Sequence, residues 1–246
     1  MGTEIFMALK TTLKLLGKST AIGDEGGFAP DLDGDEQAVE VILDAVQRAG
    51  YKPGIDAVIA LDAAASGWYN CDTDSYFLPK SKREFSSNKL CAFWEDLRRK
   101  YPIISIEDPF NEDDFALTAT LTRKIGKNTN IVGDDLFVTN KERLLKGIKE
   151  NCANAILIKL NQIGTLSESL QTVLCAQSHG YKAIISHRSG ETEDPFIADL
   201  AVALGAGMIK TGAPCRSERV CKYNRLLRIE EHLKSAAVYA GLDILK

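Results

Sequence analysis

The stretch AIISHRSGETEDPF, residues 183–196, changes character halfway along its length. Its first half is apolar and β-branched, which predicts a buried strand, and this strand ends abruptly in His187, Arg188 and Ser189. An acidic cluster follows, and Pro195 stands where a helix can begin without losing a hydrogen bond. The succession of strand, polar loop and helix predicts one unit of an α/β fold.

Five further runs have the same apolar, β-branched character. They are DAVIALDAA (56–64), PIISIEDPF (102–110), NIVGDDLF (130–137), AILIKLNQ (155–162) and GMIKTGAP (207–214). Segments with helical periodicity separate successive runs, and strands connected in this way pair in parallel through right-handed crossovers. Because the strands are apolar throughout, both of their faces should be covered, as in an α/β barrel or a doubly wound sheet.

Helix starts are marked at several places in the sequence. Thr139 with Glu142, and Thr165 with Glu168, have the spacing of a capping box and predict that helices begin there. Residues 1–18, MGTEIFMALKTTLKLLGK, predict an amphipathic helix that begins almost at the first residue. Since nothing precedes this helix, we expect the chain to be cut from a longer one.

Composition limits the class of protein. A chain of 246 residues that is 45% hydrophobic can form one large domain with a substantial core, so we expect a single domain over residues 1–246. The net charge of −4 argues against a nucleic-acid partner, and no apolar run approaches the roughly 18 residues that a membrane span requires. Six scattered cysteines without CxxC spacing predict free thiols and a cytoplasmic location.

Ionisable side chains stand at the carboxyl end of every predicted strand. Because parallel strands point the same way, these ends should meet on one rim, where α/β barrels keep their active sites. One charge at a strand end is usually a solvated or capping residue, but six strands that all end this way predict a site. The side chains expected on this rim are Asp62, Glu107, Asp134, Lys159, His187, Arg188, Ser189 and Lys210.

Three carboxylates of the rim suggest a metal ion. Asp62, Glu107 and Asp134 follow neighbouring strands, and clustered anions repel one another unless a cation lies between them. Oxygen ligands without Cys or His suit Mg²⁺ first and Mn²⁺ second. The alternative is a set of carboxylates that pair with the basic side chains of the same rim.

The basic side chains suggest proton transfer and an anionic substrate. Lys159 has apolar neighbours and lies near other cations, which favours a neutral amine that can act as a general base. A structural ion pair is the alternative. Arg188, Ser189 and Lys210 suit a phosphate or carboxylate group of a small-molecule substrate.

The segment GDEGGFAP, residues 23–30, is a second polar outlier. Its glycines let the backbone turn tightly, so that the loop can hold the Glu25 carboxyl group in a cleft. Beside a metal-binding rim, Glu25 would suit a catalytic acid. An exposed turn that presents its acidic side chains to solvent is the alternative.

Six blocks of the sequence resemble the successive signature blocks of the enolase family. The blocks are GDEGGFAP, SIEDPF, GDDLFVTN, LIKLNQIGTLSES, SHRSGETED and KTGAPCRSERVCKYNRLLRIEE. The resemblance implies an enolase-type, TIM-like (β/α) barrel in the α/β class, with about six of its eight strands present. It also implies that a leading α+β domain and the first barrel strands are missing, and that the full-length protein forms a homodimer.

The resemblance also implies a reaction and a role for each residue. The reaction is the reversible dehydration of 2-phospho-D-glycerate to phosphoenolpyruvate, a lyase step of glycolysis. Lys159 would take the proton beside the substrate carboxylate, and Glu25 would help the hydroxyl group to leave. The implied Mg²⁺ ligands are Asp62, Glu107 and Asp134. The implied substrate contacts are Glu25, Glu107, His187, Arg188, Ser189 and Lys210.

Two other functions remain open from the sequence. A truncated barrel could be non-catalytic and serve as a binding protein, including at the cell surface, where Lys246 could attract lysine-binding partners; a solvated terminus is the simpler interpretation. An acid-sugar dehydratase of the wider superfamily is the second alternative. It needs no phosphate site, so the blocks SHRSGETED and KTGAP count against it.

Overall fold

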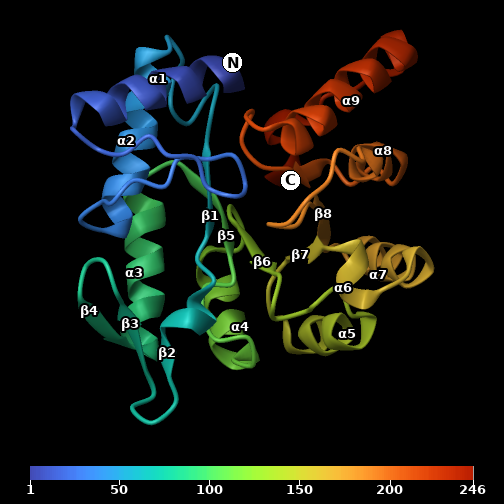
Figure 1. The fold of residues 1–246 in the computed structure, drawn as a ribbon. Coiled ribbons are helices and arrows are strands. Elements are labelled where there is room, and N and C mark those ends of the chain that lie inside the picture. Colours follow the sequence, from blue (N-terminus) through green and yellow to red (C-terminus); the bar gives the residue numbers. More distant parts are fainter. Residues whose placement is uncertain (246) are drawn as a thin grey trace.

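A parallel sheet of six strands forms the centre of the computed structural model, which describes residues 1–245 (Figure 1). The strands are β1 (Ile59–Asp62), β5 (Ile103–Glu107), β6 (Asn130–Gly133), β7 (Ala155–Ile158), β8 (Lys182–Ser186) and β9 (Met208–Lys210). They lie side by side in chain order, and every neighbouring pair is parallel. The six predicted strands and the α/β class are confirmed, and the curled sheet is an incomplete TIM-like barrel. Lys246 lies outside the described residues.

Helices follow the strands and cover the outside of the curled sheet. Their bounds are α3 Ser87–Lys100, α4 Phe115–Ile125, α5 Lys141–Glu150, α6 Leu160–Ile163, α7 Leu166–Ser178, α8 Phe196–Ala203 and α9 Ser217–Leu233. Helix α4 packs against β6, α7 against β7 and β8, and α8 against β8 and β9. Two N-terminal helices, α1 (Gly2–Leu15) and α2 (Asp35–Arg48), pack on each other near the β1 end of the sheet, whereas α8 and α9 lie at the β9 end (Figure 1).

A small antiparallel sheet, which the sequence did not predict, is inserted between β1 and β5. Its strands are β2 (Tyr69–Asn70), β3 (Ser75–Leu78) and β4 (Arg83–Ser86). Each is too short to show a periodicity, and polar turn residues separate them. The insertion explains why the interval between the first two strands of the large sheet is longer than the others.

One of the two predicted capping boxes is confirmed. Thr165 accepts a hydrogen bond from the Glu168 N–H at 3.2 Å and donates to its carboxylate at 2.6 Å. The other prediction is wrong, because Asn140 caps α5 in place of Thr139. The Thr139 side chain is fully buried and accepts a hydrogen bond from the Lys159 N–H at 2.9 Å, so it serves the rim of the barrel instead.

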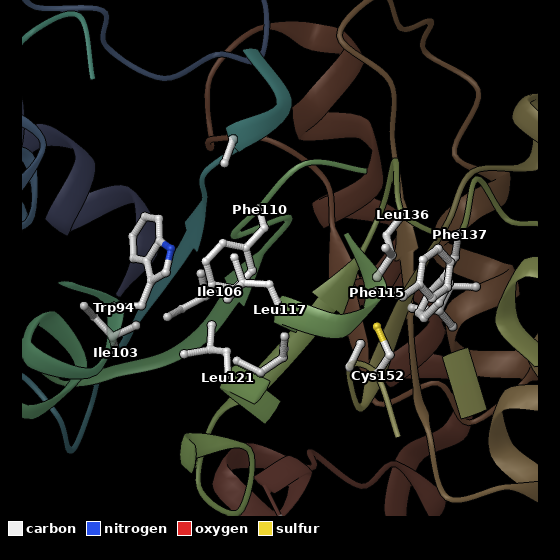
Figure 2. Close-up of a cluster of buried hydrophobic side chains, with 14 of the residues drawn as sticks. Trp94, Ile103, Ile106, Phe110, Phe115, Leu117, Leu121, Leu136, Phe137 and Cys152 are labelled. Carbon is white, nitrogen blue, oxygen red and sulfur yellow. The ribbon is translucent and has the colours of Figure 1, made fainter. Parts of the chain in front are cut away.

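The core lies between the sheet and the outer helices (Figure 2). Aromatic and branched side chains from β5, α4 and the loop after β6 fill it, and Phe137 is fully buried among them. The ring of Phe137 fits between two glycines: a Cβ atom at Gly133 would lie 2.4 Å from it, and one at Gly147 would lie 2.5 Å from it. This packing fixes the end of β6, and with it the backbone that leads into Asp134.

No helix in the described part of the chain is long and apolar enough to cross a membrane.

Candidate active site

A cavity of 360 Å³ lies at the carboxyl ends of β1, β7, β8 and β9. Its walls come from the strand ends, from the loop after β8 and from the loop of residues 23–30. The residues that line it are Glu25, Asp62, Lys159, Asn161, Ser186, His187, Arg188, Ser189, Gly190 and Lys210. Of the side chains that the sequence predicts for the site, only Glu107 and Asp134 do not line this cavity, and both make ion pairs with side chains that do.

Lys210, at the end of β9, forms ion pairs with side chains on β1 and β5, so it connects the two edge strands of the sheet, β9 and β1. Its Nζ atom lies 2.6 Å from Asp62 Oδ2, on β1, and 2.8 Å from Glu107 Oε1, on β5. Burial, together with repulsion from Asp62, raises the pKa of Glu107 to about 8, although Lys210 opposes the shift. Burial disfavours the charged form of Lys210, but the attraction of Glu107 and Asp62 outweighs it and raises the pKa of this lysine.

Asp134 and Lys159 form a second ion pair, next to the first. Burial raises the pKa of Asp134 even though the Lys159 ammonium group opposes this shift. Only one carboxylate oxygen of Asp134 contacts the lysine, and the other, Oδ1, is buried without a hydrogen-bond partner among residues 1–245. A buried oxygen without a partner is costly, so Oδ1 is available to a ligand from outside the chain.

Asp108, which the sequence analysis did not single out, fixes the backbone at Asp134. Its two carboxylate oxygens accept hydrogen bonds from the N–H groups of Asp134, at 3.0 Å, and Asp135, at 2.7 Å. Burial raises the pKa of Asp108 to about 7, and these two hydrogen bonds oppose the shift. Asp108 directly follows Glu107, so the sequence motif contained it, but its role depends on a contact between two strands.

The carboxylates of the rim could hold a hard cation. Among the described residues, Asp108, Asp134 and Asp135 have oxygen atoms within 4.8 Å of one another. The set predicted from the sequence, Asp62, Glu107 and Asp134, is connected through the two lysines instead. In both sets the ligand atoms are carboxylate oxygens, which Mg²⁺ prefers, and both sets include Asp134, whose Oδ1 atom has no partner among residues 1–245.

Glu25 enters the cavity from a loop that is locked in place by two glycines. Gly26 has φ +82°, and a Cβ atom there would lie 2.7 Å from the carbonyl oxygen of Cys215. Gly212 has φ +86°, and a Cβ atom there would lie 2.6 Å from the carbonyl oxygen of Glu25. The Ala213 N–H donates to that same carbonyl oxygen at 2.9 Å. The two segments therefore approach as closely as backbones can, and only glycine fits.

The Glu25 carboxylate meets the loop after β8. Ser189 Oγ donates a hydrogen bond to its Oε1 atom at 3.0 Å, and His187 Nε2 lies 3.4 Å from its Oε2 atom. Next to them, the Arg188 guanidinium group donates to Asn161 Oδ1 at 2.6 Å. Asn161, on α6, was not predicted, because a neutral amide just beyond a strand gives no signal of charge.

Arg219 on α9 lies behind the loops and was also not predicted. It is fully buried, and its Nη1 atom lies 2.6 Å from His187 Nδ1. It also donates to the carbonyl oxygens of Arg188, Ser189 and Asp24 at 2.7–2.8 Å. On a helix as polar as SERVCKYNR, an arginine is normally solvent-exposed, so no local pattern predicts that this one is buried.

The family described as the C-terminal TIM barrel domain of enolase matches residues 1–246. The match agrees with the parallel half-barrel and with the polar cavity at the carboxyl ends of its strands. It supports a lyase of the enolase type. The chain therefore belongs to the enolase C-terminal TIM barrel domain family.

Proposed function

We propose that this chain carries the catalytic barrel of a phosphopyruvate hydratase, which converts 2-phospho-D-glycerate reversibly to phosphoenolpyruvate and water. One observation carries the proposal. A candidate base, Lys159, and a candidate acid, Glu25, line the same cavity as three side chains that suit anionic groups, namely Arg188, Ser189 and Lys210.

Lys159 is the proposed base for the proton next to the substrate carboxylate. That proton is weakly acidic, because its removal adds negative charge to an anionic molecule. Cationic groups placed where this charge develops lower the barrier, by about 3 kcal/mol each. Lys210 supplies such a charge at the carboxylate of the substrate, and Arg188 with Ser189 would bind its phosphate group.

Glu25 is the proposed acid for the second half of the reaction. As the C–O bond of the substrate breaks, Glu25 donates its proton to the leaving hydroxide, which departs as water. The contacts of Glu25 with Ser189 and His187 would hold the carboxyl group in place for this transfer. In the reverse direction the two residues exchange roles, with Glu25 as the base toward water and Lys159 as the acid.

Asp62, Glu107 and Asp134 would hold Mg²⁺ at this site. The unpartnered Oδ1 atom of Asp134 and the all-oxygen ligand set support this fit. When bound, Mg²⁺ supplies positive charge that stabilises the anionic substrate and its deprotonated form. Lys159 and Lys210 pair with these same carboxylates, and both amines would be free to face the substrate when those ion pairs are broken.

The test is turnover of 2-phosphoglycerate by the chain with Mg²⁺, followed by the absorbance of the enol product. We expect Lys159→Ala to lower kcat by about 10²–10⁴-fold, the usual contribution of a general base. Lys149→Ala, on the exposed side of α5, is the matched control and should leave the rate unchanged.

Three results would contradict the proposal. A folded sample without turnover would favour the non-catalytic binding protein. Equal rates for Lys159→Ala and the unchanged chain would show that Lys159 is not the base. Turnover that a phosphonate analogue of the substrate does not inhibit would favour a dehydratase without a phosphate site.

A further inference from the structure

The two ring nitrogens of His187 face different surroundings. Nδ1 lies 2.6 Å from Arg219 Nη1, whereas Nε2 lies 3.4 Å from Glu25 Oε2. Nε2 is buried and makes no hydrogen bond within residues 1–245. The imidazole ring thus has one nitrogen against a guanidinium group and the other 3.4 Å from the carboxylate of the proposed catalytic acid.

The contact with Arg219 decides which nitrogen carries the proton. A guanidinium group has five N–H donors and no acceptor, so Nδ1 must accept the hydrogen bond and cannot itself be protonated. The ring is therefore neutral, and its one proton is on Nε2. A second proton, on Nδ1, would set two N–H groups against each other at a short distance.

The charges around His187 act in the same direction. Burial lowers the pKa of His187, and the positive charges of Arg219 and Lys210 lower it further. The carboxylates of Glu25 and Glu191 act in the opposite direction and do not compensate. These four groups come from α9, β9, the loop of residues 23–30 and the loop after β8, which are the segments that face the ring.

The same guanidinium group connects the two loops of the pocket. It donates to the carbonyl oxygen of Asp24 in one loop, and to those of Arg188 and Ser189 in the other. Its aliphatic part packs against Gly212, where a Cβ atom would lie 2.7 Å from Arg219 Cδ. Arg219 is fully buried and has no path to the cavity, so it acts only through the groups that it holds.

We propose that Arg219 is a positioning residue: it holds His187 as the neutral ring with the proton on Nε2, beside Glu25, and it fixes the two loops that carry Glu25 and the contacts to the substrate anion. The catalytic consequence rests on the proposed function. The protonation state of His187 does not, and it can be measured without any turnover.

The first experiment is ¹⁵N NMR of the histidine rings in the whole chain between pH 5 and pH 8. We expect the ¹⁵N signals of His187 to be those of a neutral ring with the proton on Nε2 at every pH in this range. An ordinary histidine, by contrast, would become charged below about pH 6.5. A proton on Nδ1, or a charged ring at pH 7, would overturn the proposal, and this test needs no variant.

The second experiment compares Arg219→Met with Lys222→Met. Lys222 is also fully buried on α9, but it donates to the carbonyl oxygens of Thr192 and Glu218, lies 3.7 Å from Glu191 Oε1 and makes no hydrogen bond to His187. In folded Arg219→Met we expect a mixture of the two neutral forms and protonation at higher pH. The spectrum of Lys222→Met should keep the proton on Nε2, and a change of equal size in both variants would reduce Arg219 to a general packing role.

The third experiment reads out the catalytic consequence. Misplaced loops should lower kcat/KM of Arg219→Met by about 10²-fold, and the rate should fall further below about pH 6.5 as the freed histidine becomes charged. Arg219→Lys keeps a donor for Nδ1 and should restore the pH profile of the unchanged chain with only part of the rate. A pH profile of Arg219→Met with the same shape as that of the unchanged chain would overturn the positioning role. If no variant turns over substrate but the NMR result is as expected, the proposed function is wrong and the role of Arg219 at His187 still stands.

Discussion

The pocket is built in two ways, and the two halves differ in what holds them. The strand-borne half consists of Asp62, Glu107, Asp134, Lys159 and Lys210, which stand at a strand end or directly after it. The loop-borne half consists of Glu25, Arg188 and Ser189, which stand on the loop of residues 23–30 and on the loop after β8. His187 joins the two halves, because it directly follows β8 and its N–H donates to the Lys210 carbonyl oxygen at 2.9 Å.

The two halves are held by contacts between segments that are separated by different distances along the chain. Main-chain hydrogen bonds between adjacent strands fix the strand-borne half, and they continue as far as the pairs of Asp62 with Glu107 and of Ser186 with Lys210. The loop-borne half is fixed by contacts between remote segments, such as the bond from Arg219 to the carbonyl oxygen of Asp24. A local pattern in the sequence can indicate the first kind of support but not the second.

The largest effect should come from breaking the loop-borne half at its tightest backbone contact. Gly212→Ala forces a side chain into φ +86° and places its Cβ 2.6 Å from the Glu25 carbonyl oxygen. We expect a loss of about 2–4 kcal/mol in the free energy of unfolding, from backbone strain and overpacking together. Urea unfolding measures it.

Gly180→Ala is the matched control for this change. Gly180 also has positive φ, +76°, but no atom lies within 4 Å of a Cβ placed there, so only the backbone strain of about 1 kcal/mol should appear. Equal losses in the two variants would show that the close approach of the two loops contributes nothing to stability.

The next effect tests the strand-borne half through its metal ligands. Mg²⁺ at 100 times its dissociation constant should stabilise the chain by about 2.7 kcal/mol, which corresponds to an increase in Tm of roughly 5–11 °C. Glu107→Gln and Asp134→Asn should both abolish this increase. Thermal unfolding with Mg²⁺ and with EDTA measures the difference.

Asp135→Asn decides between the two carboxylate sets. If the increase in Tm survives in this variant, the ligands are those predicted from the sequence. Loss of the increase in Asp135→Asn together with its survival in Glu107→Gln would place the ion at Asp108, Asp134 and Asp135 instead.

The last test is the dependence of stability on pH in the metal-free chain. Burial raises the pKa of Glu107 from 4.5 to about 8, so in this interval the folded chain binds more protons than the unfolded chain. Its stability should therefore fall as the pH rises from about 4.5 to about 8. Glu107→Gln should flatten this slope in EDTA. A residual slope up to about pH 7 should remain, because burial also raises the pKa of Asp108 to about 7. An unchanged slope in Glu107→Gln would show that this carboxyl group keeps an ordinary pKa in the fold.

Much of the strand-borne half was predictable because one rule generates it. Apolar runs that end in charged residues, repeated six times, predict both the parallel sheet and the rim on which Asp62, Lys159 and Lys210 meet. The rule also has limits. It leaves open whether the three carboxylates hold an ion or pair with lysines. The structure pairs two of them with Lys210 and one with Lys159, and the ion stays a prediction.

The features that the sequence did not reveal depend on tertiary contacts. Thr139 has the spacing of a helix cap, but its side chain accepts a hydrogen bond from the Lys159 N–H instead. Asn140 caps the helix α5. The strands β2 to β4 are too short to show a period. Arg219 lies on a polar helix, and only the carbonyl groups that meet there explain why a cation can be buried.

The arrangement of Phe137 between Gly133 and Gly147 has a consequence for how this scaffold can be altered. The three positions share a single volume, since any atom added at either glycine must be taken away from the ring. A library that varies them one at a time will therefore find almost only losses. Joint variation, with a smaller side chain at 137 for each larger one at 133 or 147, opens a route by which the neighbouring Asp134 can be moved without unfolding the barrel.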